Sequence, residues 1–213
     1  MSEIVKNFLN IKSSINNSNV NIIAVSKTFS INKIKPLVDF GHIHFGENKV
    51  QEAKNKWLKI RENNPKLQLH MLGKLQTNKT KDAVKLFDYI HSLDNEKLAI
   101  AIAKYENLLG KKNKYFIQVN IGNEHQKSGM QIDKIYNFYL FCKKNLLNII
   151  GLMCIPPNDN NAKNYFTEIS KLNKLLKLDQ ISMGMSADYL DAVESGSTFV
   201  RIGSAIFGDR ITK

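Results

Sequence analysis

The sequence has little of three things that would place it in a familiar class: cysteine, long apolar runs and arginine. No apolar run approaches the roughly 20 residues that a membrane-spanning helix needs. Residues 1–6 lack the basic, then apolar, then small order of a secretory signal. The two cysteines, Cys142 and Cys154, are too far apart for a CxxC pair and too few for a disulfide scaffold. These absences predict a cytoplasmic protein with no membrane association.

Arginine is scarce although the chain is strongly basic. Lys and Arg number 31 against 19 Asp and Glu, a net charge of +12, yet the only arginines are Arg61, Arg201 and Arg210. Such a surplus can indicate a nucleic-acid partner. However, lysine makes poor bidentate contacts to bases, and the lysines are spread along the chain among many asparagines. We therefore expect solvated lysine faces and no nucleic-acid partner, with salt-dependent polyanion binding as the competing hypothesis.

Strand-like and helix-like segments alternate along all 213 residues. Helical spacing and cap signals predict helices at residues 3–12, 30–41, 49–61, 77–87, 94–109, 132–142, 162–176 and 186–196. Short apolar runs predict strands within residues 22–28, 42–48, 67–72, 89–93, 115–121, 149–155, 180–183 and 198–202. This alternation indicates an α/β fold, a single-domain (β/α)8 barrel over residues 1–213. An open doubly wound sheet is the alternative, but it would need fewer units or a linker, and no linker-like stretch exists.

The first expected strand carries a lysine at its carboxyl end, Lys27. On the rim of a buried parallel strand the ammonium loses hydration, which lowers its pKa. An amine of lowered pKa is a nucleophile that can form a Schiff base with an aldehyde. The alternative is a strand-end lysine that extends to water. The remaining candidate residues favour the nucleophile.

Small residues follow the last two expected strands. In (β/α)8 barrels the active site lies at the carboxyl ends of the strands, and phosphate often binds after strands seven and eight. Residues 183–186 end in Ser186, which we expect to cap a helix with Asp188 in its first turn, and Gly203 and Ser204 follow the eighth strand. Backbone N–H groups and hydroxyls at helix starts suit a phosphate dianion.

Arg201 lies inside the eighth expected strand of a chain that uses lysine almost everywhere else. A guanidinium stays charged, so near a barrel core it needs an acceptor. One interpretation is an ion pair with a core carboxylate. The other is a donor toward an aromatic ring nitrogen or an acid group of a ligand.

Two histidines, His42 and His44, are spaced to share one strand face. No cysteine or second histidine pair joins them at the spacing of metal ligands. We therefore expect core or rim histidines and no metal, and the same holds for His70.

These candidates belong to an ordered set of motifs. The set comprises Ala-Val-Ser-Lys-Thr at 24–28, Phe-Gly-Glu-Asn at 45–48, residues 73–80, Gln-Lys-Ser-Gly at 126–129, Gly-Leu-Met at 151–153, Ser-Met-Gly-Met-Ser at 182–186 and Val-Arg-Ile-Gly at 200–203. With these motifs, from about residue 22 to residue 210, the sequence resembles the pyridoxal 5′-phosphate homeostasis proteins of the YggS/PROSC type. That family has the alanine racemase type of barrel without the racemase's additional β-domain.

The resemblance implies that pyridoxal 5′-phosphate (PLP) is the cofactor, held as a Schiff base on Lys27, with Arg201 facing the pyridine nitrogen. It implies further that the phosphate is held by Ser186, Gly203 and Ser204, and that the ring pocket is lined by Asn48, His70 and Met153. Lys127, just beyond the fifth strand, is a candidate for cofactor transfer. This sequence departs from the family pattern at Leu69, where an aromatic residue is frequent, at Lys74, where proline is usual, and at Ser204, where threonine is common.

The expected activity follows from Arg201. Arginine does not give up its proton, so a pyridine nitrogen that faces it stays unprotonated and the ring is a weaker electron sink. Racemases with this arrangement add a second base near a partner subunit, and the chain has no room for the domain that helps to build such a site. We therefore expect no catalytic turnover, but a monomer or weak dimer that carries and buffers PLP, maintains vitamin B6 and amino and keto acid levels, and supplies PLP-dependent apo-enzymes. The alternative is a small PLP-dependent racemase or lyase that acts on amino acids.

Overall fold

The computed structural model describes residues 1–124 and 127–209, so Gln126 and Arg210 lie outside the described residues. In the described part, eight parallel strands close into a barrel in chain order, and the first pairs with the last. The strands are β1 (Asn21–Val25), β2 (His44–Glu47), β3 (Gln68–Met71), β4 (Tyr89–Leu93), β5 (Lys114–Val119), β6 (Ile149–Cys154), β7 (Gln180–Ser182) and β8 (Phe199–Ile202). The predicted (β/α)8 barrel is confirmed.

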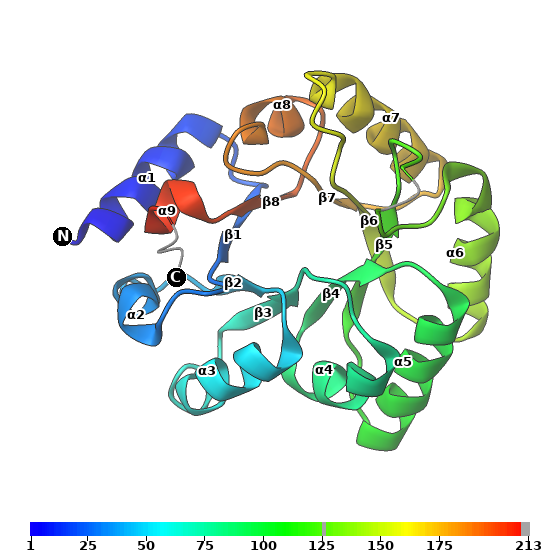
Figure 1. The fold of residues 1–213 in the computed structure, drawn as a ribbon, viewed down its shortest axis with the longest axis horizontal. Helices are drawn as coiled ribbons and strands as arrows, with labels where there is room; N and C mark the ends of the chain where they lie inside the picture. The colour runs from blue at the N-terminus through cyan, green and yellow to red at the C-terminus, as the bar shows by residue number, and fades with distance from the viewer. Residues whose placement is uncertain (125–126, 210–213) are drawn as a thin grey trace.

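Helices surround the ring of strands (Figure 1). They are α1 (Glu3–Ile15), α2 (Ile31–Asp39), α3 (Val50–Asn63), η1 (Thr77–Lys79), α4 (Thr80–Leu86), α5 (Glu96–Leu109), η2 (Ile132–Lys134), α6 (Ile135–Lys144), α7 (Ala162–Leu175), α8 (Tyr189–Glu194) and α9 (Ser204–Phe207). Helix α5 shows how local chemistry sets an end. The Asn95 side chain accepts a hydrogen bond from the Leu98 N–H, and Gly110 ends the helix in the left-handed conformation.

The predicted cap of the short helix α8 is wrong. The helix begins after Asp188, not at Ser186. The Asp188 carboxylate accepts the Met185 N–H at 2.6 Å, and this bond closes the turn in which Ser186 lies. Because Asp188 closes this turn and immediately precedes helix α8, the Ser186 hydroxyl does not cap the helix.

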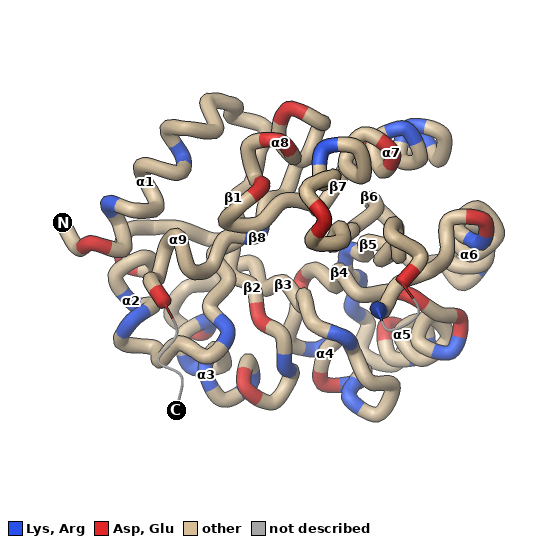
Figure 2. The backbone as a smooth tube through the Cα atoms, turned by 45° about the horizontal axis from the view of Figure 1, so that its top comes forward, with Lys and Arg blue, Asp and Glu red and all other residues tan. Residues whose placement is uncertain are grey.

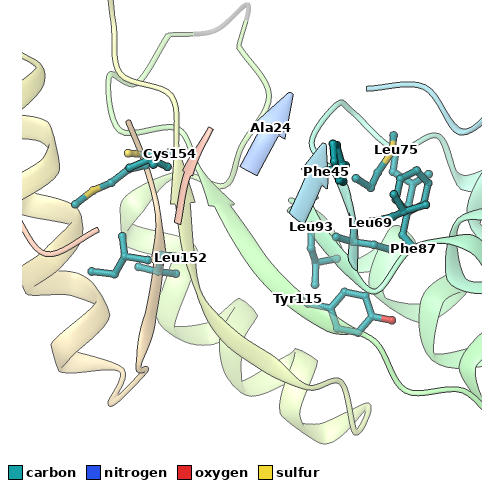
Figure 3. Close-up of a cluster of buried hydrophobic side chains, with 14 of the residues drawn as sticks. Ala24, Phe45, Leu69, Leu75, Phe87, Leu93, Tyr115, Leu152 and Cys154 are labelled. Carbon is teal, nitrogen blue, oxygen red and sulfur yellow. The ribbon is translucent and has the colours of Figure 1, made fainter. Parts of the chain in front are cut away.

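Apolar side chains fill the layer between the strands and the helices. Figure 3 shows Phe45, Leu69, Leu75 and Phe87 grouped together in this layer. The inside of the barrel is separate, with a small apolar cluster that comprises Ile23, Tyr89, Phe116, Met153 and Phe199. The barrel therefore has an outer apolar layer and an inner space with its own composition.

The basic surplus is distributed around the molecule. Figure 2 shows Lys and Arg on many of the outer helices, interspersed with Asp and Glu. Among the described residues, no helix combines the length and hydrophobicity that a membrane crossing requires.

Candidate functional site

Lys27 lies two residues beyond the end of β1, at the carboxyl end of the barrel, and is half-buried. Its two chain neighbours differ in environment. Ser26 is fully buried, and its N–H donates to the Gly46 carbonyl at 2.9 Å, which continues the pairing of β1 with β2. Thr28 adopts a left-handed φ of 68°, which turns the chain away from the strand. The predicted rim position of Lys27 is confirmed.

A buried carboxylate, Glu47, holds the near side of the Lys27 turn. One of its oxygens, Oε1, accepts from the Ser26 hydroxyl at 2.7 Å, from Lys56 Nζ at 2.9 Å and from Trp57 Nε1 at 2.9 Å. Lys56 also donates to the Ser26 carbonyl at 2.8 Å. Ion pairs and hydrogen bonds of this kind are strong in a dry environment. Helix α3 therefore fixes the backbone from which Lys27 projects.

A second carboxylate, Glu52, holds the far side of the same turn. It accepts the Thr28 N–H at 2.6 Å and Lys56 Nζ at 3.0 Å. Burial alone would raise the pKa of Glu52, but the bonds from Thr28 and Lys56 outweigh it and the pKa is lowered. Sequence reasoning missed Lys56 and Glu52, because their role depends on the docking of α3 and not on the motif around residue 47.

Arg201 projects into the barrel from β8 and is 5% exposed. Its guanidinium donates to the Ser182 hydroxyl at 2.8 Å and to the Cys154 carbonyl at 2.9 Å. Burial lowers the pKa of Arg201 from its usual value. Among the ion pairs of the described residues none involves Arg201, so the interpretation as a partner of a core carboxylate is wrong. The remaining N–H groups stay available for another acceptor.

Two serine hydroxyls meet beside the end of β8. Ser186, in the turn after β7, and Ser204, at the start of α9, have Oγ atoms 3.4 Å apart. Gly184 permits this turn, because it has a φ of +90° and a Cβ there would lie 2.5 Å from that of Ala192. With Gly203 next to Ser204, the structure brings together all three residues expected at a phosphate.

A hollow of about 350 Å³ at the barrel mouth is lined by Asn48 and Lys127, among other residues. Lys127 pairs with Glu124 at 2.5 Å and donates to the Pro156 carbonyl at 3.3 Å. Gly73 lets the chain after β3 approach closely, since a Cβ there would lie 2.3 Å from the Asn48 carbonyl oxygen. Asn48, expected in the ring pocket, and Lys127, expected at the rim, therefore line the same hollow.

The other two expected ring-pocket residues lie inside the barrel. Met153 is 1% exposed and packs in the inner apolar cluster. His70 is fully buried, and both of its ring nitrogens bond to other histidines, His44 at 3.0 Å and His91 at 2.9 Å. Sequence reasoning missed His91 entirely.

The expectation that His42 and His44 share a strand face is wrong. His42 precedes β2, and its ring packs against Phe8 of α1 and Phe45 on the outside of the barrel. His44 instead packs against Phe199 inside it. Among the described residues, no group of three or more His, Cys, Asp or Glu side chains is arranged to hold a metal ion.

Comparison with known proteins shows which family this barrel belongs to. The family model for the alanine racemase N-terminal domain matches residues 1–211. The pyridoxal phosphate homeostasis protein of Vibrio cholerae is 38% identical over 204 residues, which are 91% of this chain and 86% of that protein. The chain belongs to the family of pyridoxal phosphate homeostasis proteins. Another member, from Escherichia coli K12, is 32% identical over 90% of this chain and 86% of its own length.

Solved structures agree with the family assignment. The PipY protein of Synechococcus elongatus, in a structure with PLP bound, matches with a TM-score of 0.88 and 32% identity over 96% of this chain and all of that one. An alanine racemase of Clostridium difficile matches with a TM-score of 0.76 and 17% identity, over 99% of this chain and 57% of the racemase. The racemase shares the fold, and its additional length accounts for the rest of that chain.

Proposed function

We propose that this protein carries and buffers PLP, which it binds as a Schiff base on Lys27, and that it maintains PLP and amino and keto acid levels without catalytic turnover. The observation that carries the proposal is the convergence of Lys27, Arg201 and the serine pair at the carboxyl end of one barrel. In the covalent step the Lys27 nitrogen bonds to the cofactor's aldehyde carbon, and the aldehyde oxygen leaves as water. The names of the relatives and the PLP-bound PipY structure support the same cofactor.

The residues present fit the parts of PLP. The hydroxyls of Ser186 and Ser204, next to Gly203, are donors suited to the phosphate. Arg201 has N–H groups left for the ring nitrogen after its bonds to Ser182 and Cys154. Asn48 and Met153 line the ring pocket from the rim and from the interior, respectively. His70 lines the pocket without donating a hydrogen bond to the cofactor, because both of its ring nitrogens are already bonded to other histidines.

Arg201 also limits the chemistry. When bound in an enzyme, PLP draws electrons from an amino acid attached to it, and a protonated ring nitrogen strengthens this effect. Arg201 donates to the nitrogen without giving up its own proton, so the ring remains a weak electron sink. This side chain favours holding the cofactor over turning over amino acids.

Transfer of the cofactor takes place at the barrel mouth. Lys127 lines the hollow beside Asn48 and is the candidate amine that receives the aldehyde on its way to a recipient apo-enzyme. The protein works as a monomer or weak dimer in the cytoplasm. Lys127→Ala should leave PLP binding intact and slow transfer to an added apo-enzyme.

The proposal is tested by reducing the purified protein with borohydride in the presence of PLP and mapping the modified peptide by mass. The modification should lie on Lys27 and vanish in Lys27→Ala, along with the absorbance band of the bound cofactor. Lys33→Ala, on the exposed face of α2, is the matched control and should label normally. Labelling that is spread over many lysines, or kept in Lys27→Ala, would overturn the proposal.

Turnover is tested separately. A racemase or lyase exchanges the Cα hydrogen of its substrate, so amino acids incubated with the protein and PLP in deuterated water would gain deuterium at enzymatic rates. We expect exchange no faster than with free PLP. Rapid exchange of any amino acid would favour the enzymatic alternative.

A further inference from the structure

A continuous chain of hydrogen bonds crosses the inside of the barrel and ends at Arg201. Starting at β2, His44 Nδ1 lies 3.0 Å from His70 Nε2, and His70 Nδ1 lies 2.9 Å from His91 Nε2. His91 Nδ1 in turn lies 2.9 Å from the Ser182 hydroxyl, which accepts from Arg201 at 2.8 Å. Side chains from five strands (β2, β3, β4, β7 and β8) are thereby linked.

Arg201 dictates the direction of every bond in this chain. A guanidinium can only donate, so Ser182 Oγ accepts from it. Among the hydrogen bonds of the described residues, the only other partner of the Ser182 hydroxyl is His91 Nδ1. Because Ser182 is fully buried and a buried hydroxyl proton needs an acceptor, His91 Nδ1 takes the serine proton. A neutral imidazole whose Nδ1 accepts carries its own proton on Nε2. His91 therefore donates to His70 Nδ1, and by the same rule His70 donates to His44 Nδ1.

The surroundings keep the histidines neutral and dry. His70 stacks on Tyr89 and His91 on Phe116, each with ring centroids 4.3 Å apart. Burial is the largest cause that lowers the pKa of His70 and of His91, and the pKa of His44 falls to about 4 by burial and by the charge of Lys114. No water is needed to complete the chain, because each ring nitrogen between Ser182 and His44 already has a protein partner.

We propose that Ser182, His91, His70 and His44 are positioning residues that form one oriented hydrogen-bond chain, with all three histidines in the Nε2–H tautomer, and that this chain holds the Arg201 guanidinium in place for the ring nitrogen of the cofactor. Because the Ser182 proton is committed to His91, the serine lone pairs face Arg201. The role toward the cofactor rests on the proposed function, whereas the chain itself is a property of the protein alone.

The first experiment requires no cofactor. Long-range ¹H–¹⁵N spectra of the full chain distinguish the two nitrogens of each imidazole, and Arg201 gives side-chain signals that sharpen when its rotation is restricted. We expect neutral Nε2–H forms for His44, His70 and His91 and a restricted Arg201. Ser182→Ala should let His91 change tautomer and should free Arg201, and Ser182→Thr, which keeps the hydroxyl, should restore both. Ile23→Val, an interior change outside the chain, should alter neither.

The second experiment titrates the same variants with PLP. Ser182→Ala and His91→Phe should weaken PLP binding about tenfold, the loss of roughly one hydrogen bond to a charged group, and should shift the absorbance of the bound cofactor, whereas Ser182→Thr and Ile23→Val should resemble the unmodified chain. An Nδ1–H or cationic histidine at neutral pH would overturn the chain. A folded Ser182→Ala protein with unchanged Arg201 signals and PLP affinity would overturn the positioning role. Failure of the unmodified chain to bind PLP would instead defeat the proposed function, while the spectra would still decide the chain.

Discussion

The outer layer and the inside of the barrel are both closed to water, yet they are filled by different chemistry. The outer layer consists mainly of aliphatic and aromatic side chains such as Leu69, Phe87 and Phe166, with a few buried polar groups among them. The inside holds His70, His91 and other polar groups in an aromatic lining. Apolar burial stabilises directly, whereas buried polar groups contribute little net stability even when fully bonded. Stability is therefore concentrated in the outer layer, and the inside is organised to hold Arg201.

The largest effect on stability is expected from an outer-layer cavity. Leu69→Ala removes a fully buried side chain next to Phe45 and Phe87 and should lower the free energy of unfolding by about 3 kcal/mol. His91→Phe, which replaces a polar interior ring by an apolar one of similar size, should cost less stability and more PLP affinity. Urea denaturation and PLP titration of both variants measure the contrast. If the two variants lost stability and affinity in the same proportion, the comparison would fail.

Glu47 is an exception to the contrast between an apolar outer layer and a polar interior, because it is a charged group in the outer layer. Glu47→Gln keeps an acceptor for Ser26 and Trp57 but removes the charge that pairs with buried Lys56. Unfolding should become easier by about 2 kcal/mol, and PLP affinity should fall because the Lys27 turn loosens. Glu62→Gln, exposed on the same helix, serves as the control and should change neither. A stability loss with unchanged PLP affinity would show that the turn does not depend on this carboxylate.

Most of the fold was predictable from the sequence, because hydrophobic periodicity depends on the chain alone. The strand Tyr89–Leu93 was predicted with its observed bounds, and Gly110 ended its helix as expected. The cap at Ser186 was wrong, since the competing bond from the Met185 N–H to Asp188 arises only once the turn is formed.

Of the candidate site, only the residues that follow or lie within the predicted strands could be predicted from the sequence. Lys27, Ser204 and Arg201 follow or lie within strands, so their place at the barrel mouth followed from the fold. His91 contacts His70 on the neighbouring strand β3 and, across the barrel interior, Ser182 on β7, and no local sequence pattern indicates these contacts. The bond that Arg201 donates to Ser182 depends on the register of the neighbouring strands β7 and β8, which sequence reasoning did not supply.

His44, one of the three histidines of the hydrogen-bond chain inside the barrel, should make stability depend on pH. The pKa of His44 is about 4 in the folded protein, against an ordinary value of 6.5, with burial the main cause. The unfolded chain therefore takes up a proton that the folded chain does not. The stability due to neutral His44 is complete above about pH 6.5 and is lost as the pH falls toward 4, by about 1.4 kcal/mol per pH unit.

The measurement compares urea denaturation of the unmodified chain and of His44→Phe at about pH 7.5 and about pH 5. The variant should lose less stability between the two values, because it has no proton to take up on unfolding at this position. Equal losses would mean that His44 is already able to bind a proton in the folded state.

The smallest effect on stability is expected at the solvent-exposed surface, outside the apolar layer and the barrel interior. Lys35 and Asp39 form an ion pair at 2.6 Å on helix α2, with side chains 64% and 58% exposed. In water such a pair gains little, because solvent screens the charges and two mobile side chains must be ordered. Lys35→Ala should therefore change the free energy of unfolding by less than about 0.5 kcal/mol and leave PLP binding unchanged. A loss comparable to that of Glu47→Gln would mean that surface charge, and not the buried carboxylate, stabilises this side of the barrel.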